Sequence, residues 1–426
     1  MITVRVRHGA AALAAAAVLL SGGVPTAHAA PSPAPSPTLP AGLYGTGDPT
    51  YDGVWRQSLA FMAQQVAGVE PNRTAVDWLL DQQCDSGGFA SYRPDPAKTC
   101  DPRTPLDTNA TAVAVQALSG VDRPEAAEPG TDPVSKAIGA GAAWLKGVQN
   151  KDGGWGYNPG APSDANSTSV VVSALAAIGH RPGGITSSGG RTPYDALLGF
   201  ALPCDAGKGG GAFAYQPDAK TGALVANADA TAAAVLAGLG KDIRTRGVEP
   251  EQKPTCATPA RPTAERAARN GAAWLAGALA GSGHLDLPPM PGAASTAPRP
   301  DVGNTADAVI ALGAAGHGGK AAGAVAWLKK NSAAWARANG PAAWAQLVLA
   351  AHTVGEDARD FGGVDLVRGL NATGPAPRSV PLEEKPEQQE TEEEPGFDVW
   401  LVVGVFLVAG MGIGFLLSGR KRNRQL

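Results

Sequence analysis

An internal repeat is the feature that most constrains how this 426-residue chain folds. Three segments, over 83–112, 149–169 and 210–232, share a Gly-rich turn with an aromatic residue, then Tyr-x-Pro, then an Asp or Asn four residues before a threonine. A fainter copy covers 301–306. A unit of this length is too long for one helix and suits two helices with a long loop. The aligned threonines are Thr111, Thr168, Thr231 and Thr305, spaced by 57, 63 and 74 residues.

The pattern between the turns is helical. Segments that follow the aligned threonines, such as 113–118 and 170–175, are apolar on nearly every side, which is typical of buried helices. Segments with a Trp-Leu pair, such as 144–145, are mixed and suit an outer layer. We therefore predict an all-α fold of about twelve helices, six inner and six outer. The expected helices cover 51–68, 73–83, 107–119, 133–149, 164–179, 193–203, 227–240, 263–281, 301–316, 321–331, 341–354 and 360–370.

Charge and composition exclude several classes of function. The chain has 38 acidic and 35 basic residues, and no folded segment carries a dense Lys/Arg stripe, so we expect no nucleic-acid partner. The six histidines are scattered, and the four cysteines form no CxxC pair. This distribution predicts neither a metal site nor a cofactor.

The two ends of the chain indicate export and anchoring. Residues 1–29 resemble a signal peptide, and 30–47 form a Pro/Ser-rich linker. Residues 373–397 form an acidic stalk before an apolar segment over 398–418 that is long enough to span a bilayer. The tail over 419–426 is basic, which favours a cytoplasmic location. We therefore predict a single-pass type I protein of the cell membrane whose domain over 48–372 is extracellular.

The four cysteines of an exported chain are expected to pair. Three pairings are possible. Cys84 with Cys100 closes the shortest span, around the first Gly-rich turn. Cys204 and Cys256 then remain for the second bridge.

Two resemblances to known families indicate which all-α fold the chain adopts and what it binds. The sequence Gln-x3-Gly-Gly-Phe/Trp, at Gln83–Phe89 and Gln149–Trp155, resembles the repeat of squalene cyclases and protein prenyltransferases. That superfamily is an α/α toroid, so the resemblance implies an α6/α6 toroid of parallel inner helices over 48–372. Asp107–Ala110 is similar to the Asp-Thr-x-Ala element that opens the inner helices of cobalamin carriers such as intrinsic factor and transcobalamin. That second resemblance implies a corrinoid or a similarly bulky ligand.

The repeated polar and aromatic residues have a structural and a functional interpretation. Asp107, Asp164, Asn227 and Asp301 suit N-caps, and the Gln and Gly-Gly elements suit tight turns between helices. Parallel inner helices, however, would gather these N-termini at one mouth of the ring, where they could bind a small molecule. The candidate ligand-binding residues are Phe89, Tyr92, Asp107, Asn109, Trp155, Tyr157, Asp164, Asn166, Phe213, Tyr215 and Asp229.

No catalytic residues are identified from motifs. The chain has no Asp-x-Asp-Asp acid of the squalene-cyclase type and no Asp, Cys and His set for the zinc of a prenyltransferase. The main prediction is therefore a ring that captures a small molecule for uptake without catalysis. A membrane transporter, or a separate protein that supplies a β domain, would be its partner. Two alternatives stay open: an isoprenoid cyclase or prenyltransferase-like enzyme, and a structural adhesion ring.

Overall fold

The computed structural model describes residues 39–122, 130–247, 253–287 and 299–378. The predicted signal peptide (1–29), membrane segment (398–418) and basic tail (419–426) lie outside these ranges, as do half of the linker (30–38) and most of the stalk (379–397). Within the described ranges, no helix has the length and apolar character that crossing a membrane requires.

The described residues are mostly helical, which confirms the all-α prediction. They contain twelve α-helices, three short 3-10 turns and two antiparallel pairs of two-residue strands. The helices are α1 (Gly53–Val66), α2 (Arg73–Asp81), α3 (Thr108–Ser119), α4 (Pro133–Gly147), α5 (Ala165–Ala177), α6 (Pro193–Leu198), α7 (Ala228–Gly238), α8 (Ala264–Leu279), α9 (Val302–Ala314), α10 (Ala322–Asn339), α11 (Pro341–Val354) and α12 (Leu366–Asn371). The strand pairs are β1 (Phe213–Ala214) with β2 (Ala226–Asn227), and β3 (Leu285–Asp286) with β4 (Pro300–Asp301).

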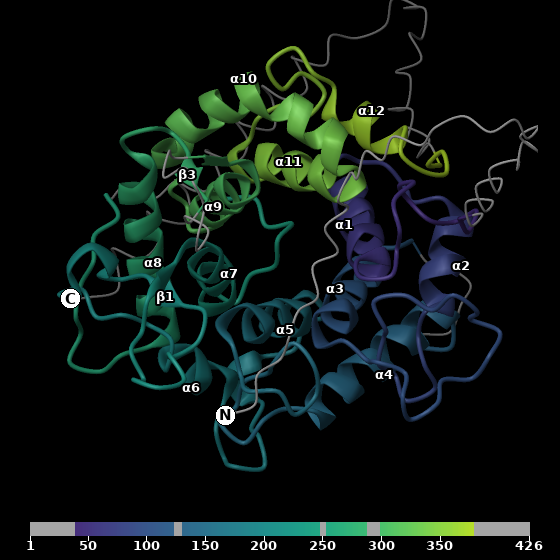
Figure 1. Ribbon diagram of the computed structural model, residues 1–426, viewed down its shortest axis with the longest axis horizontal. Helices are drawn as coiled ribbons and strands as arrows, with labels where there is room; N and C mark the ends of the chain where they lie inside the picture. The colour runs from purple at the N-terminus through teal and green to yellow at the C-terminus, as the bar shows by residue number, and fades with distance from the viewer. Residues whose placement is uncertain (1–38, 123–129, 248–252, 288–298, 379–426) are drawn as a thin grey trace, which may run out of the picture.

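The odd-numbered helices form a closed ring. In the order α1, α3, α5, α7, α9 and α11 each helix packs against the next, and α11 packs against α1 (Figure 1). The even-numbered helices lie on the outside of this ring. The order follows from the sequence pattern, because helices that are apolar on every side are stable only where neighbours cover them. In α9, for example, every residue from Ala308 to Ala314 is buried.

The inner helices are parallel, with their N-termini at one end of the ring. The N–H of Thr108, which starts α3, donates to the carbonyl of Tyr157 in the turn before α5. The N–H of Ala165, which starts α5, donates in the same way to Tyr215 before α7. The starts of α3 and α5 are therefore each joined to the turn of the next repeat, and they lie at one level.

The Gly-rich turns are structural, as one of the two interpretations predicts. The Gln83 amide donates to the carbonyls of Gly87 and Ala137, at 2.9 Å each. Gly87 has a φ of +95°, and a Cβ atom there would lie 2.3 Å from the Ala140 carbonyl oxygen, so only glycine fits. Gln149 makes the equivalent bond to Gly153 at 2.7 Å.

The residues expected to be N-caps do cap their helices. The side chains of these four residues accept backbone N–H groups in the first turns of α3, α5, α7 and α9. Such a cap contributes about 1 kcal/mol to stability. The four capping residues are Asp107, Asp164, Asn227 and Asp301.

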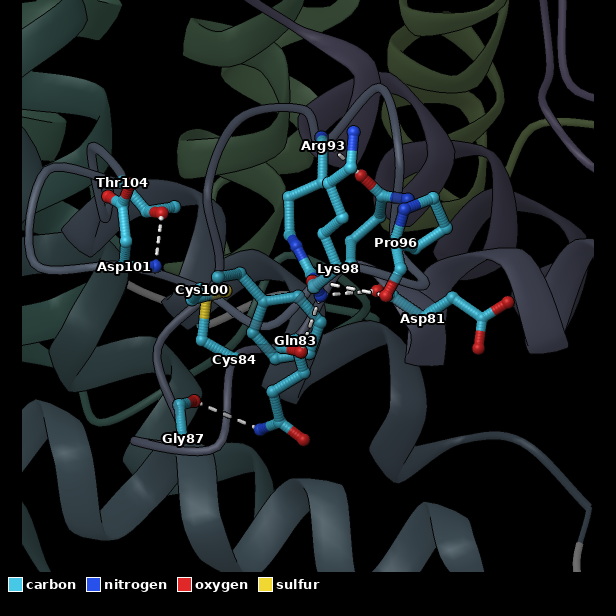
Figure 2. Close-up of a disulfide and its surroundings, with 12 residues drawn as sticks. Asp81, Gln83, Cys84, Gly87, Arg93, Pro96, Lys98, Cys100, Asp101 and Thr104 are labelled. Carbon is cyan, nitrogen blue, oxygen red and sulfur yellow. Dashed lines mark hydrogen bonds between the residues drawn. A yellow bond between two sulfur atoms is a disulfide. The ribbon is translucent and has the colours of Figure 1, made fainter.

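Both predicted disulfides are present. Cys84 pairs with Cys100 and Cys204 with Cys256. Figure 2 shows the first bridge beside Arg93, whose guanidinium donates to backbone carbonyls on both sides of the loop, including that of Asp81 at 2.8 Å. The disulfide and this arginine together hold the long first loop against the end of α2.

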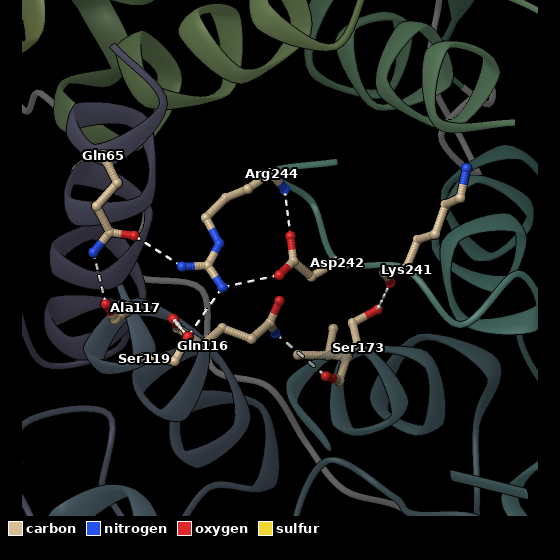
Figure 3. A network of polar contacts seen from close by, with 9 residues as sticks. Gln65, Gln116, Ala117, Ser119, Ser173, Lys241, Asp242 and Arg244 are labelled. Carbon is tan, nitrogen blue, oxygen red and sulfur yellow. Dashed lines mark hydrogen bonds and ion pairs between the residues drawn. The ribbon is translucent and has the colours of Figure 1, made fainter. Parts of the chain in front are cut away.

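The opposite end of the ring is covered by the segment 241–247, which follows α7. Its Arg244 donates to Gln65 on α1 and to Ser119 at the end of α3, at 3.0 Å each, and pairs with Asp242 at 2.9 Å (Figure 3). The Lys241 ammonium donates to the Ala314 carbonyl at the end of α9. Cations at helix C-termini are favourable because carbonyl dipoles converge there. We call this segment the floor loop.

Candidate functional site

A cavity of about 410 Å³ lies inside the ring. Its walls come from one face of each of α1, α3, α5, α7 and α9, and Ile243 of the floor loop also lines it. Tyr51 and Tyr157, both exposed, stand at its entrance on the side of the helix N-termini. The remaining lining residues are Asp52, Trp55, Leu59, Met62, Ser91, Asp107, Asn109, Ala110, Val113, Gln116, Asn166, Ser169, Val170, Ser173, Asp229, Ala232, Ala233, Leu236, Asp307 and Ile310.

The cavity is polar at its mouth and mainly apolar below. On α3, the lining passes from Asn109 to Val113 one turn deeper. On α7, it passes from Asp229 through Ala233 to Leu236. Each helix contributes a residue every three or four positions, because that spacing keeps side chains on one face. An apolar cavity with a few convergent polar groups is the usual form of a small-molecule site.

Asp307 is a carboxyl group within the apolar part of this wall. Burial raises its pKa to about 7, and the charges of Asp229 and Asp301 act in the same direction. The Gln346 amide of α11 donates to Asp307 Oδ1 at 2.6 Å and to the Gly303 carbonyl at 3.1 Å. Asp307 is partly exposed and is one of the residues that line the cavity. This carboxyl is therefore protonated in a large share of molecules near neutral pH.

The other acids of the cavity are nearer the mouth. Burial raises the pKa of Asp229, and the hydrogen bond from Asn166 opposes that shift. Burial also raises the pKa of Asp52, partly offset by the ion pair with Arg56 at 3.2 Å. No Lys, Arg or His is among the described residues that line the cavity. Nor do the described ranges contain three or more His, Cys, Asp or Glu side chains grouped to hold a metal ion.

The structure brings five of the predicted binding residues together in the cavity wall. Asp107, Asn109 and Asn166 line the cavity, and so do Tyr157 and Asp229. These residues come from three different repeats, and the parallel inner helices place them at one mouth.

Three other predicted residues lie outside the cavity wall. Asp164 is buried, where it caps α5 and accepts the Ser167 hydroxyl at 2.8 Å. Tyr92 packs against the hydrophobic core, and Tyr215 is exposed without lining the cavity. Asp164 and Tyr92 therefore have structural roles, as a helix cap and as part of the packing around the core.

The predicted binding residues of Phe and Trp type are in the core. Phe89, Trp155 and Phe213 are at most 1% exposed and do not line the cavity. The Trp155 indole N–H donates to the Leu145 carbonyl at 2.7 Å. The structure therefore places these three side chains in the hydrophobic core and not in the cavity wall.

Asp307 was missed by motif reasoning, although the repeat contains a signal for it. Two residues after the aligned threonine, the first three repeats have Val113, Val170 and Ala233. The fourth repeat has Asp307 at this position. A carboxyl at a position that is otherwise apolar indicates a site. Trp55 and Tyr51 carry no comparable signal, because they precede the first recognisable turn.

Comparisons with known proteins find limited similarity. The sequence matches no protein-family model. Over 145 residues it is 33% identical to drimenyl diphosphate synthase of Streptantibioticus cattleyicolor, covering 32% of this chain and 25% of that protein. The chain thus spans about a quarter of the length of this curated relative. A crystal structure of a protein from Actinoplanes matches with 17% identity and a TM-score of 0.42, covering 68% of this chain and 74% of that one.

The match to a terpene synthase is compatible with a terpenoid-cyclase-like helical fold. The expected link to cobalamin carriers is not supported by these comparisons.

Proposed function

We propose that this protein is an isoprenoid-cyclase-like enzyme in which Asp307 protonates a carbon–carbon double bond. One observation carries the proposal: a carboxylic acid with a pKa of about 7 lines the mainly apolar part of the cavity. The local similarity to a terpene synthase supports the choice of an isoprenoid. The alternative of the sequence analysis thereby becomes the preferred function, and non-catalytic capture becomes the second.

The chemistry needs no cofactor. Gln346 donates to Oδ1 of Asp307, so the transferable proton is carried by Oδ2. Transfer breaks this O–H bond and forms a C–H bond on one alkene carbon, which leaves a positive charge on the other. A second double bond of the substrate attacks that carbon and closes a ring. The cyclic carbocation then loses a proton from a neighbouring carbon to the Asp307 carboxylate, which gives the neutral alkene product and restores the acid.

The walls of the cavity suit a positively charged intermediate. Apolar residues such as Val113 and Leu236 exclude water, which would otherwise capture the cation. The aromatic ring of Trp55 and the carboxylate of Asp229 line the cavity, and both kinds of group stabilise positive charge by their electrostatic fields. The Gln346 amide positions Asp307 and does not itself react.

The position of Asp307 explains why the sequence contains no recognisable motif for a catalytic acid. An Asp-x-Asp-Asp sequence carries several carboxyls on one short segment, whereas Asp307 has its nearest acidic neighbour in sequence at Asp301. Asp307 depends instead on Gln346 of another helix and on burial, which only the closed ring provides.

The experiment measures deuterium incorporation. Full-length protein in detergent is incubated in D2O with squalene, farnesol or geranylgeraniol, and the products are analysed by gas chromatography and mass spectrometry. A cyclic product with one added deuteron is expected. Asp307→Asn should lower the rate at least about 100-fold, because an amide cannot donate this proton. The control Asp77→Asn changes an exposed acid of α2 and should leave the rate unchanged. Full activity of Asp307→Asn would refute the proposal.

Capture of an apolar small molecule without catalysis is the second candidate function. The apolar walls and open mouth of the cavity favour it over a purely structural adhesion ring. A ring that captures a ligand for uptake would pass it to a membrane transporter or to a protein with a β domain. Binding of an isoprenoid without any turnover in the D2O experiment would favour this function.

A further inference from the structure

The polar groups at the mouth of the cavity form a layer of hydrogen-bond acceptors. Asn109, Asn166 and Asp229 are the second residues of three successive inner helices, α3, α5 and α7. All three line the cavity at the level of the helix starts. We call them the acceptor layer.

Two oxygens of this layer have no partner within the described residues. The Asn166 amide nitrogen donates to the Asp229 carboxylate, which leaves the Asn166 carbonyl oxygen unpaired. This orientation is the one an ionised Asp229 requires, because only the nitrogen of the amide can donate to a carboxylate. The carbonyl oxygen of Asn109 is also buried without a partner.

A third unpaired group lies one turn deeper. Ser169 is 1% exposed and lines the cavity, and its hydroxyl has no hydrogen-bond partner among the described residues. Buried polar groups are normally paired, and a cluster of unpaired ones in a cavity wall indicates a ligand that pairs them. A ligand that pairs the Asn166 oxygen must bring a hydrogen-bond donor, because a carbonyl oxygen only accepts.

The charge of the mouth opposes an anionic ligand. The described lining contains carboxyl groups but no Lys, Arg or His. Lys241 and Arg244 are at the other end of the ring, bonded to helix C-termini. Arg56 is turned to Asp52 and to the Gly47 carbonyl. A diphosphate would therefore meet carboxylates without any countercharge.

We infer that the mouth binds the phosphate-free, hydrogen-bond-donating end of an amphiphilic ligand, and that a primary ammonium fits it best. An ammonium carries three donors for the three residues of the acceptor layer, and its charge is opposite to that of Asp229. A hydroxyl supplies one donor. The inference rests on the proposed function in one respect only, that the hydrocarbon part of the ligand is an isoprenoid. The preference for a head group can be measured without any turnover.

The test compares three C12 amphiphiles with one chain and different head groups. Dissociation constants of dodecylamine, dodecanol and dodecyl phosphate are measured by isothermal titration calorimetry on the full-length protein below their critical micelle concentrations. The amine should bind at least 10-fold more tightly than the alcohol, and the phosphate at least 10-fold more weakly than the alcohol. Equal or tighter binding of the phosphate, or no binding of any of the three, would overturn the inference.

Two variants assign the preference to the acceptor layer. Asp229→Asn should lower the affinity for the amine at least 10-fold and leave that for the alcohol within 3-fold, while the control Asp77→Asn changes neither. Asn109→Lys should increase the affinity for dodecyl phosphate at least 10-fold, since it adds a cation at the mouth. Circular dichroism checks that each variant is folded. An unchanged amine preference in folded Asp229→Asn contradicts the inference.

The outcomes separate this inference from the proposed function. If the amine preference is observed but no isoprenoid is cyclised, the cyclase proposal fails and the acceptor layer stands. If cyclisation is observed and the phosphate binds best, the inference on the head group fails and the role of Asp307 stands.

Discussion

At the scale of single residues, the ring determines the charge of Asp307. A carboxyl group in an Ala- and Val-rich helical segment would be expected to face solvent. The closed ring instead surrounds it with protein, and the Asp229 and Asp301 carboxyls raise its pKa further. The sequence does indicate an unusual acid, because other repeats have Val113 and Val170 at the position of Asp307. It does not show the burial and the neighbouring carboxyl groups that keep this acid protonated.

The pKa of Asp307 predicts how stability depends on pH. Folding raises this pKa from 3.8 to about 7, so the folded state binds the proton more tightly than the unfolded state. The resulting stabilisation is complete below the unfolded pKa and is lost as the pH rises through about 7. Relative to Asp307→Asn, the wild type should therefore lose about 1–3 kcal/mol of unfolding free energy between pH 5 and pH 8.5.

Urea denaturation of both proteins at the two pH values measures this difference. Comparison of the two proteins cancels the contribution of every other titrating group that the substitution leaves unchanged. Asp77→Asn, on the outer surface, should show no pH-dependent difference from the wild type. A constant difference between Asp307→Asn and the wild type from pH 5 to pH 8.5 would mean that Asp307 titrates normally.

At the scale of elements, one contact joins each turn to its inner helix. The threonine hydroxyl in the first turn of the inner helix accepts the N–H of the residue one or two positions after the last glycine of the turn. The sequence identified all four threonines but only three turns. The fourth turn has Leu285 in place of the aromatic residue, so it does not match the sequence pattern of the other three turns. The pairs are Phe89 with Thr111, Trp155 with Thr168, Phe213 with Thr231, and Leu285 with Thr305.

Helix positions were predicted well, because apolar patterns and capping residues define them locally. The main differences are α10, which continues to Asn339 where 331 was expected, α12, which begins at Leu366 where 360 was expected, and α6, which ends at Leu198 where 203 was expected. The extension buries Ser332 and Ala336, and it ends at Gly340, whose φ is +75°. Such tertiary packing is not encoded in a short window of sequence.

Replacing Thr168 by Val tests the contact between turn and helix. The substitution keeps the shape of the side chain but removes the acceptor of the Trp155 N–H, which is 3.0 Å away in a buried position. A buried donor without a partner costs about 1–3 kcal/mol, so Thr168→Val should lower the free energy of unfolding by that amount. Thr74→Val, on the exposed face of α2, is the control and should stay within about 0.5 kcal/mol. Equal stability of the two variants would exclude a role for this bond.

At the scale of the whole molecule, the two ends of the ring are chemically different. Acids and amides surround the open mouth, and basic residues of the floor loop cover the other end. The mouth was predicted from the repeated Asp and Asn residues. The floor loop was not, since Lys241 and Arg244 belong to no repeat and their partners are distant in sequence. The two disulfides favour an oxidising compartment, which supports the proposal that the ring is extracellular.

Arg244→Ala tests whether the floor loop closes the cavity. The Arg244 side chain is 16% exposed and bridges α1 and α3, and Gly120 lies so close to it that a Cβ atom would be 2.6 Å from a guanidinium nitrogen. Its loss leaves Gln65 and Asp242 with fewer partners and should cost about 1–3 kcal/mol of unfolding free energy. The larger effect should be local. Amide hydrogens of 241–247 should exchange at least 10-fold faster, because the loop then opens without unfolding of the ring.

Hydrogen exchange followed by mass spectrometry measures this opening peptide by peptide. Arg337→Ala, which removes an exposed arginine from α10, controls for the loss of one positive charge. Peptides from α5 should exchange at the same rate in both variants, because this helix is held by its inner-ring neighbours. Because Ile243 lines the cavity, opening of the floor loop should also admit water beside the apolar wall and weaken binding of dodecanol. Unchanged exchange in 241–247 together with unchanged dodecanol binding would mean that the other contacts of the floor loop close the ring without Arg244.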